Sequence, residues 1–210
     1  MTRGFDDWSG WIRGDRDGGA DDRAPYEIVN EILAAVRDRQ TKTVACFGRP
    51  TPARLRFLAQ CFARVVAIDR RAGEHDPAGD EPNVEYRRRA PFDLEATDRG
   101  FDVALVIASL DQDDLAEIDR RLSAIHASLA EGGLMIASVP AAPRGPAARE
   151  MRLAGRADGP PRAFHEVELQ YRLRRAGFRG VRVRRFGDED ASIDQPRERL
   201  LSVAVRRANN

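Results

Sequence analysis

The apolar residues of this chain change their spacing repeatedly, and each change predicts a different secondary-structure element. Residues 43–47, TVACF, and residues 64–69, RVVAID, are short apolar runs that are rich in β-branched side chains. Between them, apolar residues recur every three or four positions across residues 52–63, which is typical of a helix with one buried face. The stretch therefore predicts the order strand, helix, strand.

The same alternation continues to the end of the chain. Residues 101–109, FDVALVIAS, are the most apolar stretch and predict a strand buried on both faces, as parallel strands are. The remaining pattern predicts helices at residues 25–36, 115–129 and 165–176, and strands at residues 84–88, 134–139, 181–185 and 200–205. We expect Gly132 and Gly133 to cap the middle one of these helices. The alternation indicates an α/β fold, a doubly wound parallel sheet with helices on both faces.

Length and composition indicate a single domain with two irregular segments. The chain has 210 residues, of which 42% are hydrophobic, which suffices for one sizeable core. Residues 1–24 are rich in Gly, Asp and Arg but contain both tryptophans, so we expect a flexible N-terminal arm that docks as an anchor or as a lid. Residues 25–208 would form the domain, and residues 140–163 would be a proline-rich insertion on the acceptor side.

Charge is plentiful but balanced. The 35 basic and 34 acidic residues give a formal net charge of +1, which argues against nucleic acid as a partner. No uncharged apolar stretch approaches the ~20 residues that span a bilayer, and the start of the chain lacks the apolar run of a signal peptide. Cys46 and Cys61 show neither metal-binding nor disulfide spacing. We therefore expect a cytoplasmic protein without a metal site or a membrane contact.

The strand ends locate a candidate ligand site. In open α/β sheets, ligands bind at the carboxyl ends of the strands beside the first βα turn. Here that place holds the loop GRPTP after Phe47 and the acid Asp69, which ends the second strand about 20 residues beyond Gly48. An acid at this position can accept hydrogen bonds from both ribose hydroxyls. The pattern outlines an adenosine site.

Five segments, in this order, resemble the class I S-adenosylmethionine-dependent methyltransferases over roughly residues 26–206. The segments are TVACFGRPTPARL (first strand and glycine-rich loop), RVVAIDRR (second strand), GFDVALVIASLDQDDL (fourth strand), LSAIHASLAEGGLMIASVP (helix, glycine turn and fifth strand) and FHEVELQYRLRRAGFRGVRV (late helix and sixth strand). The resemblance implies a Rossmann-like, mostly parallel seven-stranded sheet whose last strand, residues 200–205, is antiparallel.

The resemblance also implies S-adenosylmethionine as the cofactor, lying across the carboxyl ends of the first, second and fourth strands. The residues at matching positions are Gly48 and Arg49 at the methionine part, Asp69 with Arg70 at the ribose, Asp93 at the adenine amino group, and Ala108, Ser109 and Leu110 behind the transferable methyl. An alternative spacing places Ala90 at the adenine in place of Asp93.

The first loop departs from the family's pattern. Cys46 stands where the family has an acid, and Pro50 and Pro52 stand at its second and third glycines. Proline cannot adopt positive φ and has no amide N–H to donate. Arg49 could bind the cofactor carboxylate as a bidentate partner or could occupy its place. Two hypotheses stay open: a rerouted but working site, or one that no longer binds the cofactor.

The leading functional hypothesis is methyl transfer from S-adenosylmethionine to a small-molecule acceptor. Such transfer needs little acid–base help, because the sulfonium is already an activated donor and alignment supplies much of the rate. His165, at a helix start, is a candidate general base, although flanking the helix is the simpler interpretation. The alternative is a catalytically inactive, methyltransferase-like protein that binds a partner protein or a second copy of the chain.

Overall fold

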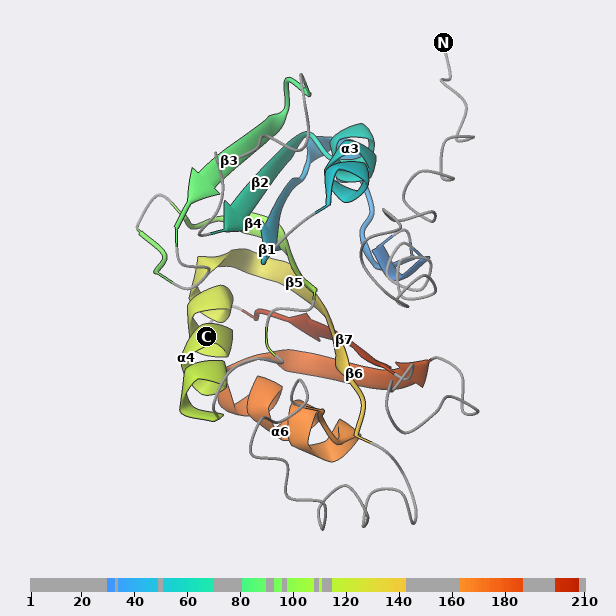
Figure 1. Cartoon of the computed structure of the whole chain (residues 1–210), viewed down its shortest axis with the longest axis vertical. Helices are drawn as coiled ribbons and strands as arrows, with labels where there is room; N and C mark the ends of the chain where they lie inside the picture. Colours follow the sequence, from blue (N-terminus) through green and yellow to red (C-terminus); the bar gives the residue numbers. More distant parts are fainter. Residues whose placement is uncertain are drawn as a thin grey trace.

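The fold is a single sheet flanked by helices (Figure 1). The structure is a computed structural model that describes residues 30–32, 34–48, 51–69, 81–89, 93–95, 98–107, 110, 115–142, 163–186 and 199–207. The strands are β1 (Thr43–Phe47), β2 (Arg64–Asp69), β3 (Val84–Arg88), β4 (Phe101–Ile107), β5 (Leu129–Pro140), β6 (Arg179–Phe186) and β7 (Arg199–Val205). The helices are η1 (Arg39–Thr41), α3 (Pro52–Cys61), α4 (Leu115–Ser128) and α6 (Glu166–Arg175), and residues 30–32 and 34–35 are also helical.

The seven strands lie in the order β3-β2-β1-β4-β5-β7-β6. β3, β2, β1, β4 and β5 pair in parallel, whereas β7 pairs antiparallel with both β5 and β6. The predicted antiparallel last strand and the mostly parallel seven-stranded sheet are thus confirmed. β1, β2 and β4 are buried along almost their whole length, which is why their sequences are continuous apolar runs.

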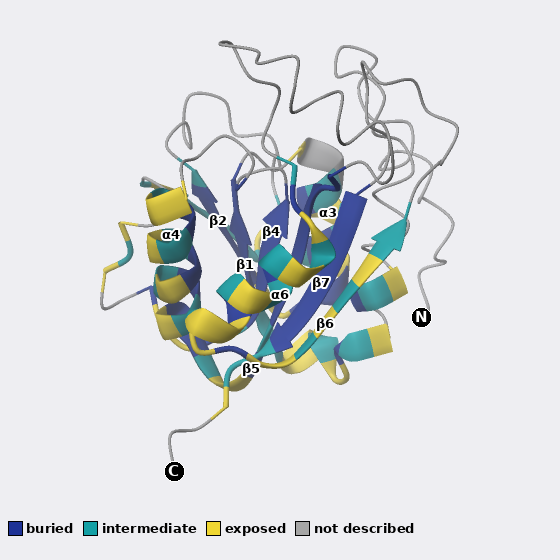
Figure 2. Cartoon of the chain, turned by 90° about the horizontal axis from the view of Figure 1, so that it is seen from below, coloured by how far each residue is buried: buried dark blue, intermediate teal, exposed yellow. Residues whose placement is uncertain are grey.

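The sheet carries helices and a buried core on each face. On one face, Ile32 from the first helical segment and Leu55 and Leu58 from α3 join one core cluster. On the other, Ile118 and Leu122 from α4 join the second cluster together with apolar residues of α6. Figure 2 shows the buried strands between helices whose outer sides are exposed. The doubly wound arrangement is therefore confirmed for the described part of the chain. Among the same residues, no helix is both long enough and apolar enough to span a bilayer.

The start of β5 differs from the prediction. The helix ends at Ser128 rather than Leu129, and β5 begins at Leu129, which pairs with Phe101. The ladder then shifts register, and Gly132 takes a φ of 75° inside β5 while its N–H donates to the Arg206 carbonyl at 2.8 Å. The glycine pair therefore lies inside β5, where the ladder with β4 is irregular, and does not cap the helix.

Two expected segments lie wholly or mostly outside the described residues. The N-terminal arm, residues 1–24 with Trp8 and Trp11, is not among them. Of the insertion at residues 140–163, only 140–142 and 163 are described. Both segments stay predictions.

Candidate functional site

The loop after β1 begins with a glycine in a conformation that other residues avoid. Gly48 has a φ of 101°, and its N–H donates to the Ile68 carbonyl of β2 at 3.3 Å. An L-amino acid with a side chain is strained at such an angle, so the sequence requires glycine here. Gly48 therefore keeps the backbone turn that directs the chain from the end of β1 toward α3.

Pro52, at the position of the family's third glycine, begins the next helix. It is the first residue of α3, where a missing N–H costs nothing and the fixed φ of proline suits the helix. The Thr51 hydroxyl caps this helix by accepting the Arg54 N–H at 3.3 Å. Proline at this position is therefore compatible with a well-formed start of α3. Arg49 and Pro50 lie outside the described residues.

Asp69 is the last residue of β2 and lies beside the end of β1. The register pairs Phe47 with Ile68, so Asp69 is level with Gly48 at the carboxyl edge of the sheet. Asp69 is half-buried, and its carbonyl accepts the Arg89 N–H at 3.1 Å. The structure thus brings together two of the predicted site residues, while Arg70 lies outside the described residues.

Cys46 occupies the place of the expected acid and is fully buried. Burial raises the pKa of its thiol from 9.0 to about 11; the charge of Arg54 opposes this rise, and that of Asp69 adds to it. The thiol is therefore neutral at physiological pH. Arg54, on the first turn of α3, is a candidate site residue that the sequence analysis missed. Its position one turn into the helix that follows the loop is the signal that could have identified it.

The predicted residues near β3 and β4 are only partly described. Leu110 is fully buried in the core cluster that contains Ile118 and Leu122, whereas Ala108, Ser109 and Ala90 lie outside the described residues. Asp93 is exposed, and the next residue, Leu94, packs against the same core. The proposed contacts of Leu110 with the methyl group and of Asp93 with the adenine stay predictions.

His165 lies at the N-terminal cap position of α6, on the side of the sheet where β5 ends. It is exposed, and its side chain makes no capping hydrogen bond. Its neighbour Phe164 is fully buried and forms a β-bridge with Ala141, directly after β5. This bridge fixes the backbone beside His165, so the histidine flanks the helix, and a role as a general base stays a prediction.

A buried arginine near the end of β5 was also missed. Arg199 is 9% exposed, and its Nε and Nη2 donate to the Oγ and carbonyl of Ser138 at 2.8 and 3.2 Å. Ser138 pairs with Ile107 at the end of β4, so this pair borders the predicted acceptor side. The sequence does not mark Arg199 as buried, because it follows the charged residues 197–198 and stands just before the apolar run that begins at Leu200. Within the described ranges, no three His, Cys, Asp or Glu residues cluster in a way that could hold a metal ion.

A scan against protein-family models gave no match, and a search of curated proteins gave none either. Solved structures, in contrast, share the fold. The N-methyltransferase NodS of Bradyrhizobium japonicum, in complex with S-adenosyl-L-homocysteine, has a TM-score of 0.65 at 15% identity over 93% of this chain and 94% of NodS. Magnesium protoporphyrin IX methyltransferase (ChlM) of Synechocystis, also with bound S-adenosylhomocysteine, has a TM-score of 0.66 at 15% identity over 93% of this chain and 91% of ChlM.

A third similar structure is a Haloferax volcanii protein solved in complex with the methyltransferase activator Trm112. Its TM-score is 0.68 at 18% identity, over 98% of each chain. Identities this low show the fold alone. The Rossmann-like fold of class I S-adenosylmethionine-dependent methyltransferases, which the sequence motifs indicated, is therefore confirmed.

Proposed function

We propose that the protein binds S-adenosylmethionine at the carboxyl ends of β1, β2 and β4 and transfers its methyl group to a small-molecule acceptor. One observation carries this proposal: Gly48, with a φ of 101°, lies level with Asp69 at the switch point of the sheet. The glycine allows the backbone to approach a ligand closely, and the acid can accept hydrogen bonds from a ribose. The S-adenosylhomocysteine bound to NodS and ChlM supports this choice of ligand.

The described residues fit such a ligand. Asp69 would hold the ribose, and Arg54, on the first turn of the helix that follows the loop, would balance the carboxylate of the methionine part. Cys46, as a neutral thiol, adds no negative charge beside that carboxylate. When bound, the sulfonium supplies an activated methyl group. The chain then has to align an acceptor with that methyl and exclude water.

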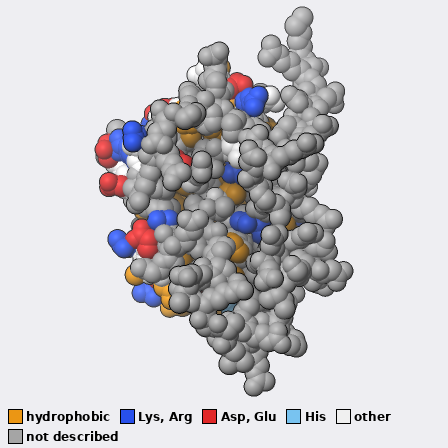
Figure 3. Space-filling model, in the orientation of Figure 1, with side chains coloured by type: hydrophobic (Ala, Val, Ile, Leu, Met, Phe, Trp, Pro, Cys, Tyr) orange, Lys and Arg blue, Asp and Glu red, His pale blue; other side chains and the backbone are white. Residues whose placement is uncertain are grey.

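A small-molecule acceptor agrees with the charge distribution. The formal net charge is +1, and Figure 3 shows basic and acidic side chains side by side on the described surface of this face. A balanced overall charge supplies no general attraction to nucleic acid, which would need a local basic patch. His165, exposed near the end of β5, would be able to take a proton from an acceptor that needs deprotonation.

A second candidate function is that of a catalytically inactive methyltransferase-like protein that binds a partner. It is favoured by the loss of the acid at Cys46, which removes one anchor for the cofactor. The similar Haloferax protein in complex with an activator supports a protein partner, and a second copy of this chain is an alternative. Binding of the cofactor separates this candidate from the first.

Isothermal titration of the purified protein with S-adenosylhomocysteine tests the proposal. We expect saturable binding by the wild type and about tenfold weaker binding by Asp69→Asn, because a hydrogen bond to a charged group is lost. Asp102→Asn is the matched control, since Asp102 lies at the amino end of β4, where it pairs with Lys42 at 3.0 Å. A folded wild-type sample that releases no heat at millimolar ligand would refute the proposal and favour the inactive alternative.

A further inference from the structure

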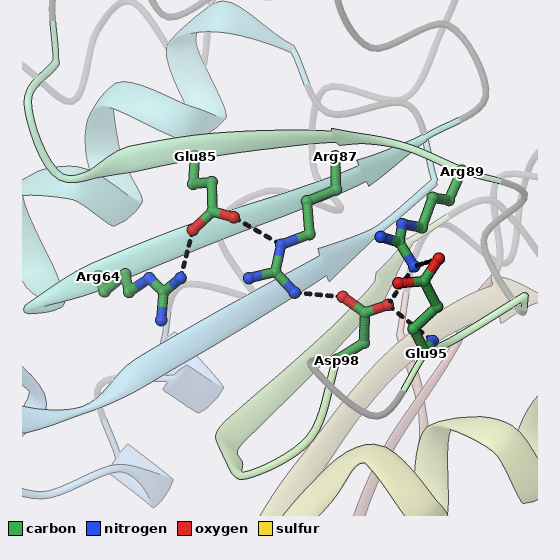
Figure 4. Close-up of polar contacts among 6 residues, drawn as sticks. All are labelled: Arg64, Glu85, Arg87, Arg89, Glu95 and Asp98. Carbon is green, nitrogen blue, oxygen red and sulfur yellow. Dashed lines mark hydrogen bonds and ion pairs between the residues drawn. The ribbon is translucent and has the colours of Figure 1, made fainter.

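A fully buried carboxylate lies in the connection between β3 and β4. Asp98 is 0% exposed and contacts two arginines from the end of β3, as Figure 4 shows. Its Oδ1 accepts from Arg87 Nη1, and its Oδ2 accepts from Arg89 Nη1 at 3.2 Å and from the Glu95 N–H at 2.8 Å. Two cations and one amide therefore compensate the charge of Asp98.

These contacts fix the Asp93 loop, which consists of residues 93–95. The Asp98 N–H donates to the Glu95 carbonyl at 2.9 Å, so Asp98 holds Glu95 through both its backbone and its side chain. Arg89 Nη1 also pairs with Glu95 Oε1 at 2.6 Å. Just before Glu95, Leu94 packs against the core and Asp93 is exposed. The position of Asp93 is thus set by anchored residues that follow it.

Arg89 joins this loop to the ribose side of the site. Its N–H donates to the Asp69 carbonyl at 3.1 Å, while its guanidinium contacts Glu95 and Asp98. One residue therefore connects the end of β2 with the loop that carries Asp93. A buried ion pair contributes little to stability compared with apolar packing, whereas it can impose one specific geometry.

We propose that Arg89 and Asp98 are positioning residues for the adenosine half of the cofactor. They hold the Asp93 loop against the carboxyl end of β2, so that Asp69 and Asp93 present their carboxylates to the sugar and the base of the same nucleoside. The inference rests on the proposed function. The inference extends the proposed function to residues that touch no ligand and act through Asp69 and Asp93.

The other end of the same cluster supplies a matched control. Arg64, at the start of β2, pairs with Glu85, which in turn accepts from Arg87 Nε at 2.6 Å (Figure 4). The side chains of Arg64 and Glu85 are 50% and 40% exposed. Removing Arg64 therefore removes one arginine from the cluster without touching the loop at residues 93–95.

The test compares Arg89→Gln with Arg64→Gln by titration with S-adenosylhomocysteine and with 5′-methylthioadenosine, which lacks the amino-acid part. We expect Arg89→Gln to bind both ligands about tenfold more weakly, by the same factor, because the charge-assisted contacts of Arg89 with Glu95 and Asp98, which order the loop, are lost. Arg64→Gln should bind both as the wild type does. Arg89→Lys, which keeps the cation, should recover part of the lost affinity.

The outcomes separate this inference from the proposed function. If the wild type binds neither ligand, both ideas fall. If the wild type binds and Arg89→Gln, folded at the same temperature, binds equally well, only the positioning role is overturned. A loss of affinity confined to S-adenosylhomocysteine would also overturn it, because the effect would then lie on the amino-acid half. Arg89→Gln keeps the contact between Arg87 and Asp98, so the variant does not leave the buried carboxylate without a cation.

Discussion

At the scale of single residues, Cys46 shows how burial decides what a side chain can contribute. The thiol is 1% exposed at the end of β1, within the apolar cluster that contains Leu55 and Leu58. A carboxylate in these surroundings would need a hydrogen-bonding partner, whereas a neutral thiol packs as a small apolar group. The negative charge at this edge of the first two strands is therefore supplied by Asp69.

The pKa of Cys46 predicts a change in stability at high pH. Because the pKa is raised from 9.0 to about 11 in the native state, the stabilisation is fully present below pH 9.0 and is lost as the pH rises through about 11. Between these values, the free energy of unfolding of the wild type should fall by about 3 kcal/mol relative to Cys46→Ala. Urea unfolding at a series of pH values measures this difference. Parallel curves for the two proteins would contradict the prediction.

The sequence indicates some site residues and conceals others for a physical reason. Gly48 and Asp69 could be predicted because each directly follows or ends an apolar run, and the end of such a run marks the edge of the sheet. Asp98 could not be predicted, because it stands in a polar stretch that resembles a solvated loop and its partners Arg87 and Arg89 belong to a run of three arginines. Ion pairs leave no periodicity, so only the structure shows that Asp98 is buried.

At the scale of elements, the apolar pattern predicted the strands better than the junction between α4 and β5. The predicted bounds of β1, β2 and β3 match the structure. Leu129 continues the helical spacing after Ile125, so periodicity alone assigns it to the helix. In the structure, Leu129 pairs with Phe101 of β4 instead. A contact between residues distant in sequence thus overrides the local pattern at this boundary.

Two glycines near the junction of α6 and β6, Gly177 in the turn and Gly180 inside β6, should respond unequally to substitution. A Cβ on Gly177, whose φ is 101°, would lie 3.1 Å from the His126 ring of α4, and that ring packs edge to face with Phe178 at a centroid distance of 5.0 Å. A Cβ on Gly180, whose φ is 56°, would make an ordinary 3.6 Å contact with Val205.

Gly180→Ala should therefore lower the free energy of unfolding by about 1 kcal/mol through backbone strain. Gly177→Ala should lower it by about 2 kcal/mol more, because the ring has to move. Urea unfolding at 25 °C gives both values. Adding His126→Ala to Gly177→Ala should recover part of the extra loss, and equal effects of the two single substitutions would show that the ring yields without cost.

At the scale of the whole molecule, the strand order places the site. The chain moves outward from β1 to β2 and β3 and then returns to β4 on the other side of β1, so the connections diverge at the ends of β1 and β4. Alternation of strands and helices predicted the layers but does not determine this order. The family resemblance implied a cofactor across the ends of the first, second and fourth strands, and the structure shows that these strands are neighbours, because β1 pairs with both β2 and β4.

A ligand that binds at the ends of β1 and β4 should raise the free energy of unfolding of the whole chain, and the increase depends on the ratio of its concentration to its Kd. At a concentration 100 times its Kd, S-adenosylhomocysteine should add about 2.7 kcal/mol to the free energy of unfolding. For a chain of 210 residues, this corresponds to a rise in Tm of about 5–10 °C. At the same concentration, Asp69→Asn, with a Kd about tenfold higher, should gain about half as much free energy.

Thermal unfolding followed by intrinsic fluorescence measures these shifts, and Asp102→Asn serves as the control. Its starting Tm should be lower than that of the wild type, because Asp102 holds Lys42 at 3.0 Å and the Thr43 N–H at 2.9 Å, but its shift should be that of the wild type. Equal shifts in Asp69→Asn and the wild type would mean that the ligand binds away from the end of β2. The fold would then stand, but the nucleoside site would have to lie elsewhere on it.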